Sequence, residues 1–174
     1  VGISRMLNLD LPVNFNSPYK AGTISEFWDR WHITLTRFFT RYLYIPLGGS
    51  RRGKIRTWIN TMVVFLCSGF WHGASWTFIF WGFLHGIAMV LNRIFGKWIS
   101  RLPSVVNWLV TFLFVNGAWI LFRAGSFGTT VSMFRSLLSN RWGGLQAEVS
   151  DAFLNYLTRY IPFIPSWGIA AGYL

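Results

Sequence analysis

The chain has 174 residues, of which 53% are hydrophobic, 20% aromatic and only 12% charged, with a formal net charge of +11. This balance excludes an ordinary soluble domain and indicates an integral membrane protein. The positive charge does not indicate nucleic-acid binding, because the lysines and arginines occur in short clusters between apolar runs. Such clusters are typical of cytoplasmic loops, where they orient membrane spans and contact anionic lipid. We therefore expect membrane lipid, and no nucleic acid, as a partner.

Several kinds of site are excluded by residue counts and spacing. The single cysteine, Cys67, allows no intrachain disulfide and no cysteine metal cluster, and we expect its thiol to be buried. The three histidines lack a close metal-ligand spacing, so no metal site is predicted. The five acidic residues are too scattered for a paired-carboxylate site. Glycine-rich phosphate loops and Gly-x-Ser-x-Gly turns are absent from the sequence.

Residues 1–56 are predicted to contain a polar lead, an interfacial amphipathic helix and a basic loop. Thr23 and Glu26 match a capping box, in which Thr23 caps the helix and Glu26 bonds back to the Thr23 amide. The helix is expected to continue to about Tyr44, because Pro46 follows. Its arginines share one side with Thr34, and a second side is formed by Trp28, His32, Leu35 and Phe39, so His32 falls on the aromatic side. A lone histidine there is more often a packed core residue than a ligand.

The uncharged run 57–92 would be roughly 54 Å long as one helix, whereas a hydrocarbon core is roughly 30 Å thick. We predict two helical pieces with a break near 69–75, so that the basic clusters flanking the run lie on one side. The run contains His72 and His85, and an ionisable residue at this depth is usually functional and faces inward. On a continuous helix these two would face well away from each other, so at most one is expected to share a pocket with His32. The spacing does not decide whether His72 or His85 shares this pocket. For both histidines, helix packing is the alternative role.

Residues 105–122 are predicted to form a third span, and 123–174 a variable C-terminal region in which 127–138 fits an amphipathic helix. The expected fold class is an all-α integral membrane protein, a multi-span helical bundle with a broken helix pair and an interfacial amphipathic helix. Three apolar runs make a poor stand-alone bundle. We therefore expect the chain to be a fragment of a longer membrane protein.

The chemistry that remains is a histidine acting as a base in a membrane cavity. Burial favours the neutral imidazole, which can accept a proton. A neutral histidine beside a hydroxyl acceptor suits general-base acyl transfer. A transporter or channel subunit that uses histidines as a proton relay is an alternative of a different class.

Two segments resemble the membrane-bound O-acyltransferase family, most closely its bacterial alginate O-acetyltransferase branch. They are NFNSPYKAGTISEFWDRWHITLTRFFTRYLYIPLGGSRRGKIRTWIN at 14–60 and FLCSGFWHGASWTFIFWGFLHG at 65–86, and WILFRAGSF at 119–127 is a weaker match. YIPLGGSRRGK is typical of this branch, whereas the branch that transfers D-alanine usually departs from it. The resemblance implies a multi-span enzyme whose acyl donor and acceptor meet in a tunnel through the membrane.

The resemblance also implies which histidines are catalytic. The near-universal histidine of the family matches His72 in SGFWHG, and a second polar position matches His32 in FWDRWH. That second position is histidine in bacterial members and asparagine in several eukaryotic ones. His72 is then the expected general base, with His32 as the partner that orients an acyl carbonyl or the acceptor. His85 falls at a position associated with helix packing, and the paired motifs argue against a proton relay.

The resemblance further implies transfer of an acetyl group, ultimately from acetyl-CoA, toward hydroxyls of an exported polysaccharide such as alginate. The expected location is the bacterial inner membrane, with periplasmic partner proteins that modify the polysaccharide and no bound cofactor. D-alanyl transfer to teichoic acid, or acylation of another glycan, is the alternative. Family members are commonly over twice this length, so residues 1–174 would be the C-terminal catalytic portion. Four residues of the basic loop are weak candidates for contacts with donor phosphates, and lipid-facing topology residues are the favoured interpretation: Arg51, Arg52, Lys54 and Arg56.

Overall fold

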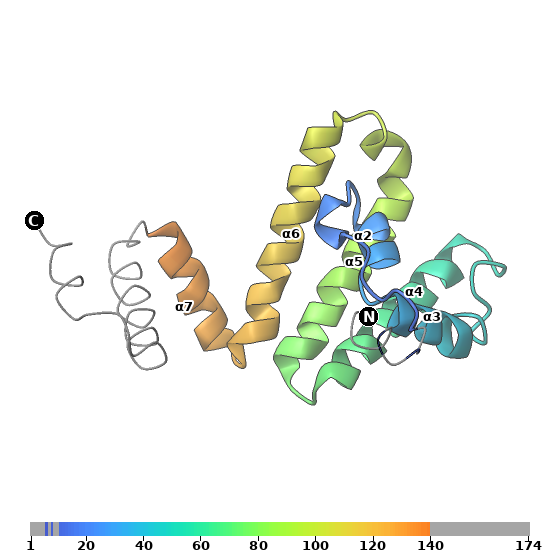
Figure 1. The fold of residues 1–174 in the computed structure, drawn as a ribbon, viewed down its shortest axis with the longest axis horizontal. Helices are drawn as coiled ribbons and strands as arrows, with labels where there is room; N and C mark the ends of the chain where they lie inside the picture. Colours follow the sequence, from blue (N-terminus) through green and yellow to red (C-terminus); the bar gives the residue numbers. More distant parts are fainter. Residues whose placement is uncertain (1–5, 7, 9–10, 140–174) are drawn as a thin grey trace, which may run out of the picture. The chain divides into compact units, whose positions relative to one another are not determined.

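The computed structural model describes residues 6, 8 and 11–139, and within them every regular element is a helix. The elements in chain order are η1 (Pro18–Lys20), α2 (Ile24–Arg30), α3 (Ile33–Phe39), η2 (Thr40–Tyr44), α4 (Lys54–His72), α5 (Trp76–Ile99), α6 (Ser104–Ala124) and α7 (Phe127–Leu138). Residues 1–130 form one compact unit, and 131–174 belong to a second. The predicted all-helical fold is confirmed (Figure 1). The part of the predicted C-terminal region from 140 onward lies outside the described residues.

Within the described residues, two helices, α5 and α6, are long and apolar enough to cross a membrane. The predicted third span, 105–122, corresponds to α6 and ends within two residues of it on either side. The helix predicted at 127–138 corresponds to α7. Helix α4 begins at Lys54, three residues before the uncharged run 57–92. The basic residues Lys54 and Arg56 therefore lie in its first turn.

Helices α4 and α5 form an antiparallel hairpin through the short turn 73–75, where the sequence predicts a break. The two backbones touch at glycines. A Cβ atom on Gly82 would overlap the Phe65 carbonyl oxygen, and one on Gly69 would overlap the Phe78 carbonyl oxygen. Small residues permit this close approach between membrane helices. The hairpin therefore holds its two helices at backbone contact distance.

The hairpin brings its basic residues to one end. Lys54 on α4 and Arg93 on α5 line the same surface hollow. The basic residues before the uncharged run 57–92 and those that begin at Arg93 after it are therefore at one end of the hairpin, as predicted. The preceding loop is attached to this end by Asn60, whose side-chain amide donates to the carbonyls of Leu47 (3.2 Å) and Gly49 (3.0 Å). The basic loop thus has a fixed position on α4.

This arrangement predicts a labelling pattern in the membrane. In a background with Cys67 replaced, cysteines at positions 54 and 97 should be shielded alike from an impermeant thiol reagent added outside intact cells, because basic ends stay cytoplasmic. A cysteine at position 72 should react slowly from either face if, as we expect, this end of the hairpin is reached only through a cavity in the membrane. Labelling at only one of positions 54 and 97 would mean that the segment crosses the membrane once, which contradicts the hairpin.

The helix predicted to run to about Tyr44 is interrupted, which corrects the prediction. Helix α2 ends at Arg30 and α3 begins at Ile33, and His32 between them adopts a left-handed backbone conformation with φ 47° and ψ 49°. The last turns, η2, are π-helical. Arg30 and Arg37 consequently lie on separate helices and do not share one helical side.

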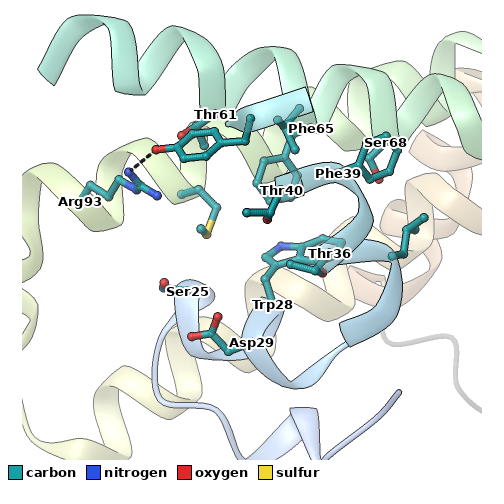
Figure 2. A pocket seen from close by; sticks show the side chains of 14 residues that line it. Ser25, Trp28, Asp29, Thr36, Phe39, Thr40, Thr61, Phe65, Ser68 and Arg93 are labelled. Carbon is teal, nitrogen blue, oxygen red and sulfur yellow. Dashed lines mark hydrogen bonds between the residues drawn. The ribbon is translucent and has the colours of Figure 1, made fainter. Parts of the chain in front are cut away.

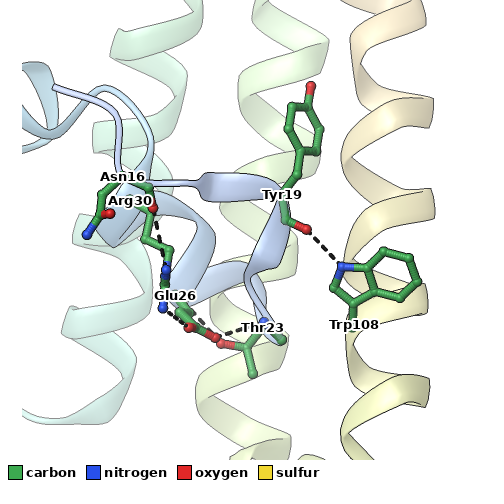
Figure 3. A network of polar contacts seen from close by, with 7 residues as sticks. Asn16, Tyr19, Thr23, Glu26, Arg30 and Trp108 are labelled. Carbon is green, nitrogen blue, oxygen red and sulfur yellow. Dashed lines mark hydrogen bonds and ion pairs between the residues drawn. The ribbon is translucent and has the colours of Figure 1, made fainter.

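The start of α2 follows the predicted capping box with one change. The Thr23 hydroxyl accepts a hydrogen bond from the Glu26 amide at 3.2 Å, as predicted. The Glu26 carboxylate, however, accepts from the Gly22 amide at 2.8 Å instead of the Thr23 amide, and it also pairs with Arg30 at 2.7 Å (Figure 3). The Glu26 carboxylate therefore bonds both Gly22, which precedes α2, and Arg30, its last residue.

The N-terminal segment is held against α6 by two hydrogen bonds. The Trp108 indole donates to the Tyr19 carbonyl at 2.8 Å, and the Thr111 hydroxyl donates to the Gly22 carbonyl at 3.2 Å (Figure 3 shows the first). These contacts attach the residues that precede α2 to α6.

The prediction of a buried Cys67 is wrong, because its side chain is exposed in the structure. The buried positions of α4 lie on the face that includes Phe65, Ser68 and Gly69, and Cys67 lies off this face.

Candidate functional site

Asn14, in the N-terminal segment, bonds the backbone that directly follows His32. The Asn14 carbonyl accepts from the Ile33 amide at 3.0 Å. Its side-chain oxygen accepts from the Thr34 amide at 3.0 Å and from the Thr34 hydroxyl at 2.8 Å. Because a left-handed conformation costs a non-glycine residue about 1–2 kcal/mol, these bonds offset strain at His32. Strained residues of this kind cluster at functional sites.

The same asparagine contacts the His32 imidazole. The Asn14 side-chain nitrogen lies 3.3 Å from Nδ1 of His32. Two aromatic rings flank the partly buried imidazole, Phe15 at 5.8 Å and Trp71 at 6.4 Å between ring centroids. His32 is therefore held in orientation at the break between α2 and α3.

His72 is the last residue of α4 and lies in an aromatic pocket. Its ring meets Trp71, Trp81 and Phe122 with centroid distances of 4.9, 5.4 and 5.1 Å and with their planes steeply inclined. The side chain is partly buried, and within the described part of the chain its imidazole has no hydrogen-bond partner. Both ring nitrogens thus remain available to a substrate.

The structure brings His32 and His72 together, as the resemblance implies. The Trp71 ring contacts both imidazoles, with its centroid 6.4 Å from that of His32 and 4.9 Å from that of His72. They come from different helices, α4 for His72 and the α2–α3 break for His32. An imidazole without a partner within the described residues can accept a proton from a hydroxyl that comes within hydrogen-bond reach.

His85 has a packing role in the structure. Its side chain is 1% exposed, and its Nδ1 accepts a hydrogen bond from the indole N–H of Trp28 at 3.2 Å. This bond joins α5 to α2, and the rings of Phe65, Trp81 and Phe114 surround the imidazole. His85 is thus engaged in holding helices together, as its position in the motif implies.

A cavity of about 230 Å³ lies between α2, α3, η2, α4 and α5. Its lining combines hydroxyl groups, including those of Thr36, Thr61 and Ser68, with apolar side chains, and neither His32 nor His72 contributes to it. Figure 2 shows Arg93 on one side of this cavity, bonded to the Tyr44 hydroxyl at 3.2 Å, and Ser68 on the other. Ser68 is one helical turn before His72, so the cavity extends along α4 from the basic end of the hairpin toward the histidine pair.

The four basic-loop candidates are placed at the surface. Their side chains are all exposed and belong to the loop and first turn of α4: Arg51, Arg52, Lys54 and Arg56. Exposure at the basic end of the hairpin is compatible with lipid contacts and with contacts to donor phosphates. Within the described residues no group of three metal-ligating side chains comes together.

Sequence reasoning overlooked Asn14. It stands at the start of the segment that resembles the family, yet no periodic pattern connects it with His32. The signal available was the turn-rich run 14–18, which predicts a loop and does not say what the loop contacts.

The fold and the site define a class of helical membrane protein. In it, His72 at the end of a helical hairpin and an oriented His32 contact the same aromatic residue, Trp71. The chain belongs to the membrane-bound O-acyltransferase family, whose model matches residues 2–130. The predicted resemblance is confirmed, and the proton-relay alternative is set aside at the level of the family.

Curated relatives support the same family. The chain is 48% identical over 142 residues to a peptidoglycan O-acetyltransferase of Helicobacter pylori, covering 79% of this chain and 27% of that protein. It is 38% identical over 142 residues to the "Probable alginate O-acetylase AlgI" of Pseudomonas aeruginosa, covering 80% of this chain and 27% of that protein. A teichoic acid D-alanyltransferase of Bacillus subtilis is 31% identical over 144 residues, or 73% of this chain and 36% of that protein. The chain thus spans a little over a quarter of the first two relatives.

Proposed function

We propose that the protein containing this chain is an O-acetyltransferase that moves acetyl groups to hydroxyls of an exported glycan, with His72 as the general base. The observation that carries the proposal is the pairing of His72, whose imidazole has no partner within the described residues, with the oriented imidazole of His32. Relatives named as O-acetyltransferases support the acetyl group as the cargo.

In the proposed reaction, neutral His72 removes the proton of a glycan hydroxyl while the hydroxyl oxygen attacks the acetyl carbonyl carbon. A carbon–oxygen bond forms, and His32 orients the carbonyl and stabilises the negative charge on its oxygen. When the carbon–sulfur bond of a thioester donor breaks, the sulfur takes the proton from His72. The imidazole returns to its neutral form, so protons and electrons balance over one turnover.

The donor in this proposal is acetyl-CoA, used as a substrate. The cavity along α4 offers it a route, because it extends from the basic end of the hairpin toward the turn before His72. Arg93 borders that cavity, and exposed basic residues such as Arg52 and Lys54 lie at the same end of the hairpin. We propose that these cations contact the phosphates of the donor. The same residues can also contact anionic lipid and orient the membrane spans.

Peptidoglycan and alginate are the two acceptors to compare. The higher identity to the peptidoglycan O-acetyltransferase, 48% against 38%, supports peptidoglycan as the acceptor that we propose to test first. D-alanyl transfer ranks below both, because the relative that carries that name is 31% identical. We further propose that the full protein is a multi-pass protein of the bacterial inner membrane that works with periplasmic proteins to modify the glycan.

The proposal is tested by expressing the full-length protein in a host that lacks its own O-acetyltransferase and supplying either peptidoglycan or alginate. Mass spectrometry of the isolated glycan should show ester-linked acetyl groups, and omission of acetyl-CoA from inverted vesicles should remove them. Proton flux across the same vesicles should match that of empty vesicles. D-alanine in place of acetyl on the acceptor would support the other branch, and a proton flux without acetylation would contradict the proposal.

A further inference from the structure

Asn14 contacts His32 in a way that determines where the imidazole proton resides. The Thr34 backbone amide can only donate a hydrogen bond, so the Asn14 atom that faces it at 3.0 Å must be the side-chain oxygen. This contact fixes the orientation of the Asn14 amide, which is otherwise ambiguous in a side chain with nearly equal nitrogen and oxygen atoms. The Asn14 nitrogen therefore faces Nδ1 of His32, at 3.3 Å.

An amide nitrogen of asparagine only donates, so Nδ1 of His32 has to accept. A neutral imidazole carries one proton, and with Nδ1 accepting, that proton is on Nε2. Within the described residues Nε2 has no hydrogen-bond partner, so its N–H group remains free to donate.

We propose that Asn14 is a positioning residue that locks His32 in the Nε2–H tautomer and thereby makes it a hydrogen-bond donor to the acyl carbonyl oxygen. This assignment rests on the proposed function and divides the two histidines by role. His72 accepts the proton of the hydroxyl, and His32 donates to the oxygen on which negative charge develops. It is consistent with the left-handed backbone at His32, because Asn14 bonds the His32 ring and also the backbone amides of the two residues that follow, Ile33 and Thr34.

Asn14→Asp in the full-length protein tests the lock with little change of shape. An aspartate at position 14 still accepts from the Thr34 amide and hydroxyl, but it can only accept from Nδ1 of His32. The neutral imidazole then carries its proton on Nδ1 and presents a lone pair at Nε2. Asn16→Asp is the matched control, because Asn16 is exposed, lies on the same segment and, among the described residues, forms hydrogen bonds through its backbone alone.

The readout is the ¹⁵N spectrum of histidine-labelled protein in lipid, recorded at a pH where the spectrum shows His32 to be neutral. The His32 signals are identified as those missing in His32→Asn. We expect a protonated Nε2 in the natural protein and in Asn16→Asp, and a protonated Nδ1 in Asn14→Asp. The kcat of acetyl transfer should fall about 10²–10³-fold in Asn14→Asp, as for loss of one oxyanion donor, with a small change in KM.

A protonated Nδ1 in the natural protein would overturn the assignment, and so would an inverted tautomer with an unchanged kcat. The spectrum reports the tautomer whether or not the protein transfers acetyl groups. Failure of the proposed function is therefore seen separately, as an absence of acetyl transfer in the natural sequence.

Discussion

Replacing His72 by alanine in the full-length protein should abolish acetylation of the glycan while leaving expression and membrane insertion intact. Loss of a general base typically costs about 10²–10⁴-fold in rate. Structural damage should be limited to lost contacts with three aromatic rings, because the His72 imidazole is partly exposed and has no hydrogen bond within the described residues. The measurement is acetyl incorporation at matched amounts of protein in the membrane. Near-normal acetylation would remove His72 from the proposed mechanism.

His85→Ala is the contrasting variant, because it removes a histidine of the same hairpin that is 1% exposed. It leaves the Trp28 indole N–H without its partner, which should destabilise the protein by about 1–3 kcal/mol. A thermal unfolding measurement in detergent should show a clearly lower Tm for His85→Ala and a smaller decrease for His72→Ala, which loses ring contacts but leaves no buried donor without a partner. The pair of variants thus separates a catalytic histidine from a packing histidine.

His32→Asn should retain more activity than His32→Ala. Orientation of a carbonyl by a hydrogen bond requires a donor, which asparagine supplies and alanine lacks, whereas proton exchange would require a titratable group. Loss of one such donor costs about 10²–10³-fold in kcat, and this is the expected result for the alanine variant. The measurement is kcat for acetyl transfer. Equal and complete loss in both variants would mean that His32 itself exchanges protons.

Asparagine also tolerates a left-handed backbone better than alanine does, so the comparison needs a control for strain at φ 47°. His32→Gly supplies it, because glycine adopts this conformation readily and has no donor. Activity of the glycine variant near that of the alanine variant would assign the effect to the hydrogen bond. Activity near that of the asparagine variant would assign it to the backbone.

The helices that could be predicted from the sequence are those governed by local signals. The turn 73–75 is rich in small residues between two apolar runs, and Ser75 caps α5 by accepting from the Thr77 amide. The position of α6 followed from an uncharged run preceded by Pro103. The family motifs identified His32 and His72, and the structure places them together. Their catalytic roles remain predictions.

The features that could not be predicted depend on contacts between distant residues. The break at His32 is stabilised by Asn14, which stands well before α2, so the local pattern predicts an uninterrupted helix. The Trp28–His85 hydrogen bond likewise joins segments that no spacing rule connects. Exposure of Cys67 follows from the rotation of α4 about its axis, which is set by the glycine contacts with α5.

Those glycine contacts also restrict how this protein can diverge. Gly82 faces Gly69 so closely that a Cβ atom on Gly82 would lie 3.2 Å from the Gly69 Cα, and the other nearest atoms belong to the Phe65 backbone. A larger residue at position 82 cannot be accommodated by a side-chain rotation, because the atoms it meets are backbone atoms. The helices would have to separate, and His72 at one end of α4 and the basic loop at the other would move with them. Evolution toward a new acceptor is therefore expected to leave this hairpin unchanged and to alter the surfaces that receive the glycan.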